Sequence, residues 1–383
     1  MILDRNYLLH SLQELVRIDS VNPSLVPGAK GETEIVNYLA EKLRALGLKV
    51  NLLESVPKRP SVVAIYPGTG NGRSLMLNAH VDTVEVECME DPFSATVKDG
   101  RLYGRGAYDM KGSAAAMLAA ARALVDQGVE LGGDLLFSFV ADEEYESLGT
   151  QEVLKHYRTD AAIVTEPTQL QICLAHKGFV WLEVETLGRA AHGSRYDEGI
   201  DANMRMGLFL AELSKLEKKL RMRRGHPLVG PPSLHAAMIQ GGTGLSTYAE
   251  KCTLFIERRT IPGESEAKVV AEVQKILDHL SEKDPTFKAT LKTLCVREPF
   301  EVSPDAQVVQ VLGQVVENVL GAAPKYMGDS PWMDAALFSA AGIETVVIGP
   351  AGQGAHSHEE WVSIESVEKL AAILAHTAIK YCQ

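Results

Sequence analysis

The sequence predicts an α/β protein in which a mixed, mostly parallel sheet is covered by helices and carries an inserted, smaller α+β domain. Three observations lead to this fold class. Short apolar runs alternate with amphipathic stretches along the first half of the chain. Hydrophobic residues make up 46% of the chain and charged residues 23%, so a full core can form. The pattern changes near residue 179, and 383 residues suffice for two or more domains at ~100–200 residues each.

The first half of the chain alternates helices with strands. Amphipathic patterns with apolar residues three and four apart predict helices at 7–18 and 32–46. Short apolar runs predict strands at 49–53, 61–66, 75–79, 134–141 and 161–165. An alanine-rich stretch at 111–125 predicts a further helix by propensity. Sheets built this way are buried on both faces and bind ligands at the carboxyl ends of their strands, so we expect the chemistry just after each strand.

The inserted domain begins where the alternation changes. Its predicted order is strand, helix, strand, strand, helix, strand, at 180–186, 203–220, 234–239, 253–260, 264–280 and 287–294. This set forms a self-sufficient α+β sandwich, which places the inserted domain at 179–294. The chain then returns to the larger domain with a helix at 306–319, a strand at 345–348 and a helix at 366–381. The larger domain therefore comprises residues 1–178 and 295–383.

Charge and composition exclude several classes of protein. The formal net charge is −12, and the densest basic stretch, from Lys218 to Arg224, is interpreted as the solvated end of a helix. We therefore expect no nucleic-acid binding, which needs clustered positive charge. No apolar run reaches the ~18–20 residues of a membrane span, and no secretory signal is visible. Five scattered cysteines, without a C-x-x-C pair, indicate reduced thiols in a cytoplasmic protein.

The first candidate site follows the strand predicted at 75–79. His80 and Asp82 are two residues apart on an extended segment, so their side chains point to the same side. Asp82 can accept a hydrogen bond from the far imidazole nitrogen of His80, an arrangement that fixes the tautomer of a metal-binding histidine. The H-x-D pattern also arises by chance, so a purely structural role stays open on this observation alone.

Two further carboxylate patterns follow predicted strands or turns. Asp109 ends a glycine-rich turn before the alanine-rich helix, where a carboxylate is also expected as a simple helix cap. The glycines of this turn match neither the G-x-x-x-x-G-K-[ST] nor the G-x-G-x-x-G pattern of phosphate-binding loops, so we discard a nucleotide site. Asp142, Glu143 and Glu144 are adjacent, so their carboxylates repel one another. This repulsion is tolerable on a solvated loop or beside a divalent cation that offsets it. Beside a cation, one glutamate can ligate while its neighbour accepts a proton from metal-bound water.

The last two candidates follow later strands. Glu166 ends the strand at 161–165, and His356 and His358 follow the strand at 345–348. Histidines and carboxylates at converging strand ends, without a thiolate, suit Zn²⁺ or a related divalent ion. Sites with two such ions hold them ~3.5–4 Å apart with a shared ligand.

These motifs together resemble the co-catalytic zinc deacylase and carboxypeptidase family, which includes acetylornithine deacetylase, succinyl-diaminopimelate desuccinylase, aminoacylase and glutamate carboxypeptidase. The matching series is H-x-D, G-R-G-x-x-D-x-K-G, D-E-E, E-P-T and H-S-x-x-E-x-V, collinear over nearly the whole chain. The resemblance implies two Zn²⁺ ions, with Co²⁺ or Mn²⁺ as possible substitutes. His80 and Glu166 would hold one ion, Glu144 and His356 the other, and Asp109 would bridge both.

The same resemblance implies a reaction. Glu143 would be the general base, supported by Asp82 beside His80, and a cis peptide bond is expected after Asp109. His358 falls on a variable position and receives no metal role. A glutamate at 166 is similar to the deacylases and carboxypeptidases rather than to the dipeptidases and aminopeptidases. We therefore expect hydrolysis of N-acyl-L-amino acids by a zinc-activated water, as in acetylornithine deacetylase.

Three alternatives stay open. The chain could be a carboxypeptidase acting on dipeptides or N-acylated glutamate, or a catalytically silent, dimeric binding protein of the same fold. Two-metal phosphoester hydrolysis is a third, which the expected carboxylate clamp disfavours. Fold alone does not decide among these functions.

The inserted domain resembles the lid and dimerisation domain of that family. His192, in A-H-G-S, matches a histidine that reaches the active site of a partner chain and stabilises the oxyanion. Arg259, in E-R-R-T-I-P-G, would clamp the substrate's α-carboxylate, although Glu257 replaces the usual aspartate. Ser246 stands where many members have asparagine, and Asp334 matches a position near the substrate. The expected partners are thus a small N-acyl amino acid or short peptide and a second copy of the chain.

Overall fold

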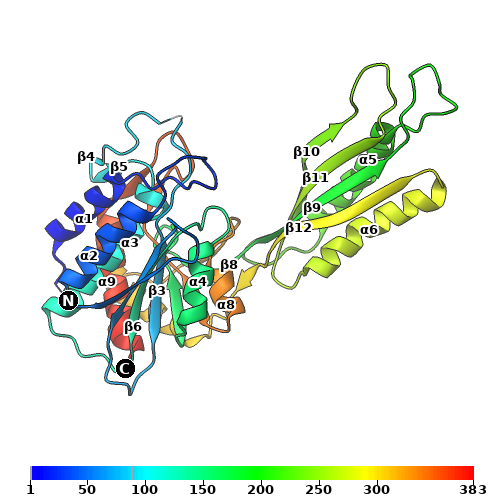
Figure 1. Cartoon of the computed structure of the whole chain (residues 1–383). Helices are drawn as coiled ribbons and strands as arrows, with labels where there is room; N and C mark the ends of the chain where they lie inside the picture. Colours follow the sequence, from blue (N-terminus) through cyan, green and yellow to red (C-terminus); the bar gives the residue numbers. More distant parts are fainter. Residues whose placement is uncertain (1, 88) are drawn as a thin grey trace. The chain divides into compact units, whose positions relative to one another are not determined.

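The computed structural model describes residues 2–87 and 89–383, so Met1 and Cys88 lie outside the description. The chain divides into two compact units, which Figure 1 shows coloured along the sequence. The first unit comprises Met1–Leu174, Val302–Met327 and Met333–Gln383, and the second comprises Ala175–Glu301 and Gly328–Trp332. The second unit thus extends somewhat beyond the range suggested by the sequence and includes a short segment from the later part of the chain.

The main sheet has nine strands and a parallel centre. Its strand order is β1-β2-β6-β3-β7-β15-β8-β13, and β14 pairs with β8. The bounds are β1 Lys49–Leu53, β2 Ser61–Tyr66, β3 Leu75–His80, β6 Leu135–Val140, β7 Ala161–Val164, β8 Ile172–His176, β13 Phe300–Glu301, β14 Tyr326–Asp329 and β15 Glu344–Val347. Strands β6, β3, β7 and β15 run parallel, whereas β2 and β8 join this centre antiparallel. The sheet is therefore mixed, as predicted, with its parallel pairings at the middle.

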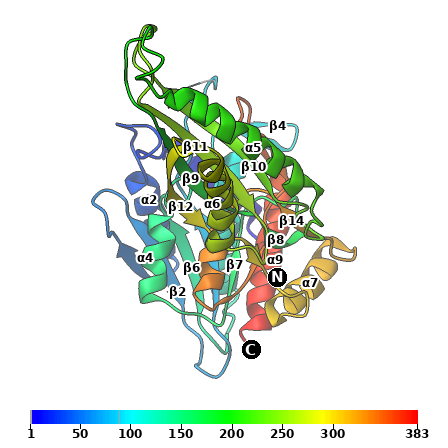
Figure 2. The same cartoon turned by 90° about the vertical axis from the view of Figure 1, so that its right-hand side faces the viewer.

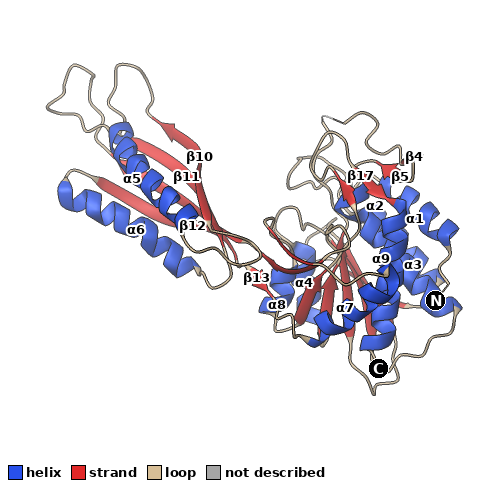
Figure 3. Cartoon of the chain, turned by 180° about the vertical axis from the view of Figure 1, so that it is seen from behind, coloured by secondary structure: helices blue, strands red, loops and turns tan. Residues whose placement is uncertain are grey.

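Helices cover both faces of this sheet, as Figure 1 and Figure 3 show. Their bounds are α1 Arg5–Arg17, α2 Thr33–Ala45, α3 Gly112–Asp126, α4 Leu148–His156, α7 Gln307–Leu320, α8 Ala335–Ala340 and α9 Ile364–Tyr381. Every residue of β3, β6 and β7 is buried, which explains their continuous apolar runs. In α1 the buried residues recur at helical spacing, and the alanines of α3 permit its close packing against α9.

A small antiparallel sheet lies in the first unit beside the irregular turn that precedes α3. Its order is β16-β17-β5-β4, with β4 Thr96–Lys98, β5 Arg101–Tyr103, β16 Gly352–Gln353 and β17 Trp361–Ser363. The turn, η1, spans Ala107–Lys111 and begins after Gly106, whose φ of 78° lies in the left-handed region that favours glycine. This sheet brings the segment around 352–361 to the turn that carries Asp109.

The second unit is an antiparallel sheet with two helices on one face, which Figure 2 shows from a second direction. The sheet order is β10-β11-β9-β12, with β9 Gly178–Leu187, β10 Ser233–Gly241, β11 Lys251–Thr260 and β12 Lys288–Arg297. The helices are α5 Ala202–Met222 and α6 Glu266–Lys283. Burial alternates along β11, with one face packed on the helices and the other open. The strand-helix-strand-strand-helix-strand order is as predicted.

Several smaller predictions can be compared with the structure. The basic stretch does end a helix, because α5 stops at Met222 with Lys219 and Arg221 in its last turn. No disulfide joins the cysteines that the structure describes. Within residues 2–87 and 89–383, no helix combines the length and the apolar character that crossing a membrane requires.

Candidate metal centre

The five predicted metal ligands come together at the carboxyl edge of the parallel strands. His80 is the last residue of β3, Glu144 follows β6, and Glu166 follows β7. His356 lies beyond β15, and Asp109 lies in the turn before α3. Because β6, β3, β7 and β15 are consecutive parallel neighbours, the residues after them meet at one edge. Gly349 permits this closeness, since a Cβ there would lie 2.1 Å from the backbone oxygen of Glu166.

Asp109 joins two groups of candidate ligands. Its Oδ1 lies 3.0 Å from His80 Nε2, and its Oδ2 lies 3.4 Å from His356 Nε2. His80 Nε2 also lies 3.7 Å from Glu166 Oε1, and His356 Nε2 lies 3.1 Å from Glu144 Oε1. In each group of three, one ligand atom per residue lies within 4.8 Å of the others. Each oxygen of Asp109 thus faces a different histidine, which is the arrangement of a ligand shared between two ions.

Asp82 supports this site differently from the sequence expectation. The Nδ1 atom of His80 lies 3.0 Å from the backbone oxygen of Asp82 and 3.6 Å from its carboxylate, so the carbonyl is the closer partner. The carboxylate instead accepts hydrogen bonds from the backbone N–H groups of Glu143 and Glu144, at 3.1 and 3.2 Å. Asp82 therefore fixes the imidazole of His80 through its backbone and the next strand's loop through its side chain.

Glu360 holds the turn of Asp109, a role that we did not assign from the sequence. Its buried carboxylate accepts hydrogen bonds from the backbone N–H groups of Gly106, Tyr108 and Asp109, at 3.0, 2.9 and 3.0 Å. Arg105 Nη1 donates to the same carboxylate at 2.8 Å. Glu360 is the glutamate of the H-S-x-x-E motif, so its place in that motif was the available signal. The peptide bond between Asp109 and Met110 is cis, which confirms that expectation.

The electrostatics of the site favour a divalent cation. Burial, and then repulsion from Glu166, raises the pKa of Glu143 well above its usual range. Burial likewise raises the pKa of Glu144 and, strongly, that of Glu166. Hydrogen bonds to Asp109 and Glu144 raise the pKa of His356 to about 10. Crowded carboxylates and histidines without a thiolate fit two hard or borderline divalent ions, whose charge offsets this repulsion.

Metal loading should release protons from the site. Because the pKa of His356 is about 10 in the folded, metal-free protein and 6.5 ordinarily, its ion pairs stabilise that state fully below pH 6.5. This stabilisation is lost as the pH rises through about 10. A histidine ligates only as the neutral imidazole, so loading near pH ~8 should expel the proton of His356.

Calorimetry in two buffers that differ in ionisation enthalpy measures this release. The apparent enthalpy of metal binding should differ between the buffers, and His356→Gln should reduce the difference. Identical apparent enthalpies in both buffers would show that the site binds metal without losing a proton, contrary to this account.

Glu143 and Asp334 border the candidate ligands. The carboxylate of Glu143 makes no hydrogen bond or ion pair within the described parts of the chain, while its backbone is held by Asp82. Asp334 is buried, and Thr150 donates to its Oδ2 at 2.5 Å. Burial raises the pKa of Asp334 to about 6. The carboxylate of Glu143 is thus free to exchange a proton, whereas Asp334 is anchored.

The other predicted residues lie in the second unit. His192 is exposed, its Nδ1 lies 2.8 Å from Ser194 Oγ, and the N–H of Gly193 donates to the backbone oxygen of Ser246 at 2.7 Å. The loops of His192 and Ser246 therefore lie side by side. An isolated antiparallel β-bridge between His192 and Thr247 joins the same two loops.

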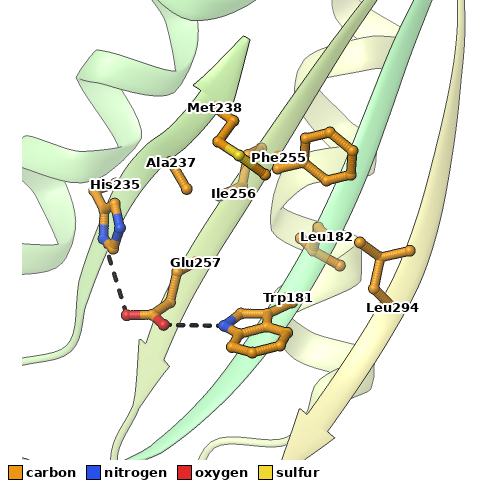
Figure 4. A pocket seen from close by; sticks show the side chains of 9 residues that line it. All are labelled: Trp181, Leu182, His235, Ala237, Met238, Phe255, Ile256, Glu257 and Leu294. Carbon is orange, nitrogen blue, oxygen red and sulfur yellow. Dashed lines mark hydrogen bonds and ion pairs between the residues drawn. The ribbon is translucent and has the colours of Figure 1, made fainter. Parts of the chain in front are cut away.

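Arg259 is held on the open face of β11. Its Nε donates to Glu257 Oε1 at 2.8 Å, and its guanidinium lies 5.2 Å from the ring centroid of Phe179. Figure 4 shows that Glu257 also accepts a hydrogen bond from Trp181 Nε1, at 2.9 Å, and faces His235. The two Nη atoms of Arg259 have no partner within the described residues. Their edge of the guanidinium is therefore available to an anionic ligand.

Known proteins match this chain along nearly its whole length. The sequence profile described as "Peptidase family M20/M25/M40" matches residues 76–380. An acetylornithine deacetylase of Myxococcus xanthus is 30% identical, with 97% of this chain and 97% of that protein covered. An N-formyl-4-amino-5-aminomethyl-2-methylpyrimidine deformylase of Bacillus subtilis is also 30% identical, with 93% of this chain and 91% of that protein covered.

A solved structure shares the fold. The crystal structure of a tripeptidase from Staphylococcus aureus superposes with a TM-score of 0.82 at 22% identity, and all of both chains is covered. The profile match, the two sequence relatives and this superposition agree with the resemblance carried by the motifs. The chain belongs to peptidase family M20/M25/M40, a family of metal-dependent amidohydrolases and peptidases.

Proposed function

We propose that this protein is an N-acyl-L-amino-acid amidohydrolase of the acetylornithine deacetylase type, working with two Zn²⁺ ions or with Co²⁺ or Mn²⁺ in their place. The observation that carries the proposal is the shared position of Asp109 between two histidines, each with its own glutamate. His80 and Glu166 would hold one ion, and His356 and Glu144 the other. The deacetylase relative, matched over 97% of both chains, supports an acylated amino acid as substrate.

The residues divide the work of amide hydrolysis. Two bound divalent ions would polarise the amide carbonyl and make a water molecule a stronger nucleophile. Glu143 would accept the proton of the attacking water and deliver it to the leaving nitrogen. Its carboxylate, which has no partner among residues 2–87 and 89–383, and its tethered backbone suit this exchange, because the group is held in place without a competing contact. Asp82 would hold the imidazole of His80 and the backbone of Glu143 in fixed positions during the reaction.

The second unit would supply recognition of the substrate. Arg259 would bind the α-carboxylate through its two Nη atoms, while Glu257 and Phe179 fix the guanidinium plane. His192 would act on the oxyanion in the active site of a second copy of the chain. Ser246, beside the His192 loop, and Asp334 would complete the contacts with substrate.

A homodimer through the second unit is part of this proposal. Strand β10 lies at the edge of its sheet, where its outer backbone groups can pair with another strand. Exposed apolar side chains flank that edge, with Met238 63% and Ile239 57% exposed on β10 and Met204 66% exposed on α5. A second copy would cover these residues and complete two sites at once.

Loss of the Arg259 guanidinium should be selective for substrates with an α-carboxylate. Arg259→Ala should lower kcat/KM for N-acetylornithine roughly 10- to 100-fold, because charge-assisted hydrogen bonds are worth about 1.5–3 kcal/mol. The same variant should leave the hydrolysis of an N-acyl amine without a carboxylate nearly unchanged. An equal loss on both substrates would exclude Arg259 as the carboxylate clamp.

A panel of substrates tests the proposed function. Free-amine release after metal loading would be measured on N-acetylornithine, N-acetylmethionine, N-succinyl-diaminopimelate, several dipeptides and an N-formyl pyrimidine amine. The last compound is included because the deformylase relative is as similar as the deacetylase. We expect the fastest release from an N-acyl-L-amino acid. Faster release from dipeptides would favour the carboxypeptidase alternative, and release from no compound would favour the silent binding protein.

A further inference from the structure

The turn after β6 determines the positions of two site residues at once, because Glu143 and Glu144 follow each other in it. Asp142 precedes them with a φ of 69°, in the left-handed region that residues other than glycine adopt infrequently. Its buried carboxylate holds the turn closed, since Oδ2 accepts the N–H of Glu146 at 3.1 Å. The conformation of this turn therefore depends on the contacts that fix the carboxylate of Asp142.

Asn22 connects Asp142 to the second carboxylate that holds this turn. Asp82 accepts the N–H groups of Glu143 and Glu144 on its two carboxylate oxygens. The Nδ2 of Asn22 donates to Asp82 Oδ2 at 2.8 Å and to Asp142 Oδ1 at 3.1 Å. Asn22, Asp82 and Asp142 are all fully buried. Bulk water therefore does not compete for these bonds, which are stronger for that reason.

Asn22 is fixed from two further directions. Its backbone N–H donates to the backbone oxygen of Thr83 at 2.8 Å, so its segment runs along the residues that follow β3. Its Oδ1 accepts from Arg59 Nη2 at 3.1 Å. The same Nη2 donates to Asp142 Oδ1 at 2.6 Å, and Arg59 forms two bonds of 2.7 Å with buried Glu32. A two-bond contact of this kind restrains the guanidinium plane, and with it the amide of Asn22.

We propose that Asn22, backed by Arg59, is a positioning residue that sets where the general base Glu143 and the ligand Glu144 lie. The inference rests on the proposed function, since it assumes an ion held by Asp109, Glu144 and His356. Neither Asn22 nor Arg59 reaches the reacting atoms in this scheme, and both act through Asp82 and Asp142. Glu166 comes from a separate loop after β7, so the ion on its side depends less on Asn22.

Removal of the Asn22 amide should weaken one ion more than the other. In Asn22→Ala, we expect the affinity for the ion assigned to Asp109, Glu144 and His356 to fall roughly 10- to 100-fold, with a similar fall in kcat and a KM within about twofold. Competition with a chromophoric chelator measures the affinity of each ion without any substrate. Arg59→Lys keeps the charge but loses the two-bond contact, and should shift the same quantities in the same direction even if Asn22→Ala does not fold.

Leu39→Ala is the matched control, because Leu39 is a fully buried apolar residue of α2 in the same unit. It should lower the midpoint of thermal unfolding while leaving ion affinity and kcat unchanged. The inference is overturned if Asn22→Ala and Arg59→Lys keep wild-type ion affinity and kcat, or if Leu39→Ala at equal stability shows the same losses. Failure of the proposed function looks different: the wild-type protein would then neither bind two ions nor release amine.

Discussion

Replacement of Glu143 by glutamine should lower kcat by ~10²–10⁴-fold, the range that a positioned general acid–base contributes. The amide cannot accept the proton of the attacking water, yet it has nearly the same size, so the fold and the ion content should not change. The carboxylate of Glu143 has no hydrogen-bond partner within the described chain, so its replacement breaks no side-chain hydrogen bond there. Steady-state kinetics together with metal analysis of the purified variant would measure both quantities.

Glu152→Gln is a matched control for this change. Glu152 lies on α4 and pairs with Lys155 and His156 at the surface, both at 2.9 Å, where such pairs contribute little. Its kinetics should equal those of the wild type. An unchanged kcat in Glu143→Gln would remove Glu143 from the reaction and leave the site without an identified base.

Replacement of Asp109 by asparagine should abolish the binding of two ions at the candidate metal centre. Both groups of candidate ligands include Asp109, so this one change weakens the binding of both ions. Loss of a residue that merely supports a ligand costs 10–100-fold in affinity or activity, so loss of the shared ligand should cost at least ~10²-fold in kcat/KM. Metal analysis after dialysis should find the variant depleted of both ions.

Asp126→Asn changes an exposed aspartate that pairs with Arg122 on α3, at 3.1 Å, and should alter neither metal content nor activity. If Asp109→Asn lost one ion and kept the other with wild-type affinity, Asp109 would be an ordinary ligand of one ion. The bridging arrangement would then be wrong.

The long elements of the fold were predictable because each has a strong periodic pattern. Strands such as β3 and β6 are buried on both faces, which produces the apolar runs that predict them. Helix α4 was not predicted: it spans nine residues, and its buried positions include Gly149 and Thr150, which give no apolar period. The strands of the small sheet, of two or three residues each, are shorter than any period that a sequence can display.

The candidate metal ligands were predicted for a different reason, because their motifs resemble those of the co-catalytic zinc deacylase and carboxypeptidase family. Each follows a strong strand pattern or a glycine-rich turn, and parallel neighbours bring such positions together. The supporting residues were not found from the sequence. Asn22 and Arg59 contact the site across 60 and 83 residues of chain, to Asp82 and Asp142 respectively, and no local spacing encodes such contacts. Asp82 illustrates the limit within a motif, because its spacing predicted proximity to His80 but not which oxygen would be the partner.

The most direct test of the account is a metal titration of the metal-free protein with amine release as the readout. Zn²⁺ would be added stepwise while bound ions per chain and the rate of amine release from N-acetylornithine or the best compound of the panel are measured together. We predict that release is absent without metal, rises with occupancy and reaches its maximum at two ions per chain, one for each group of ligands. Full rates after chelation, or two bound ions with no amine released from any compound, would contradict the proposed function.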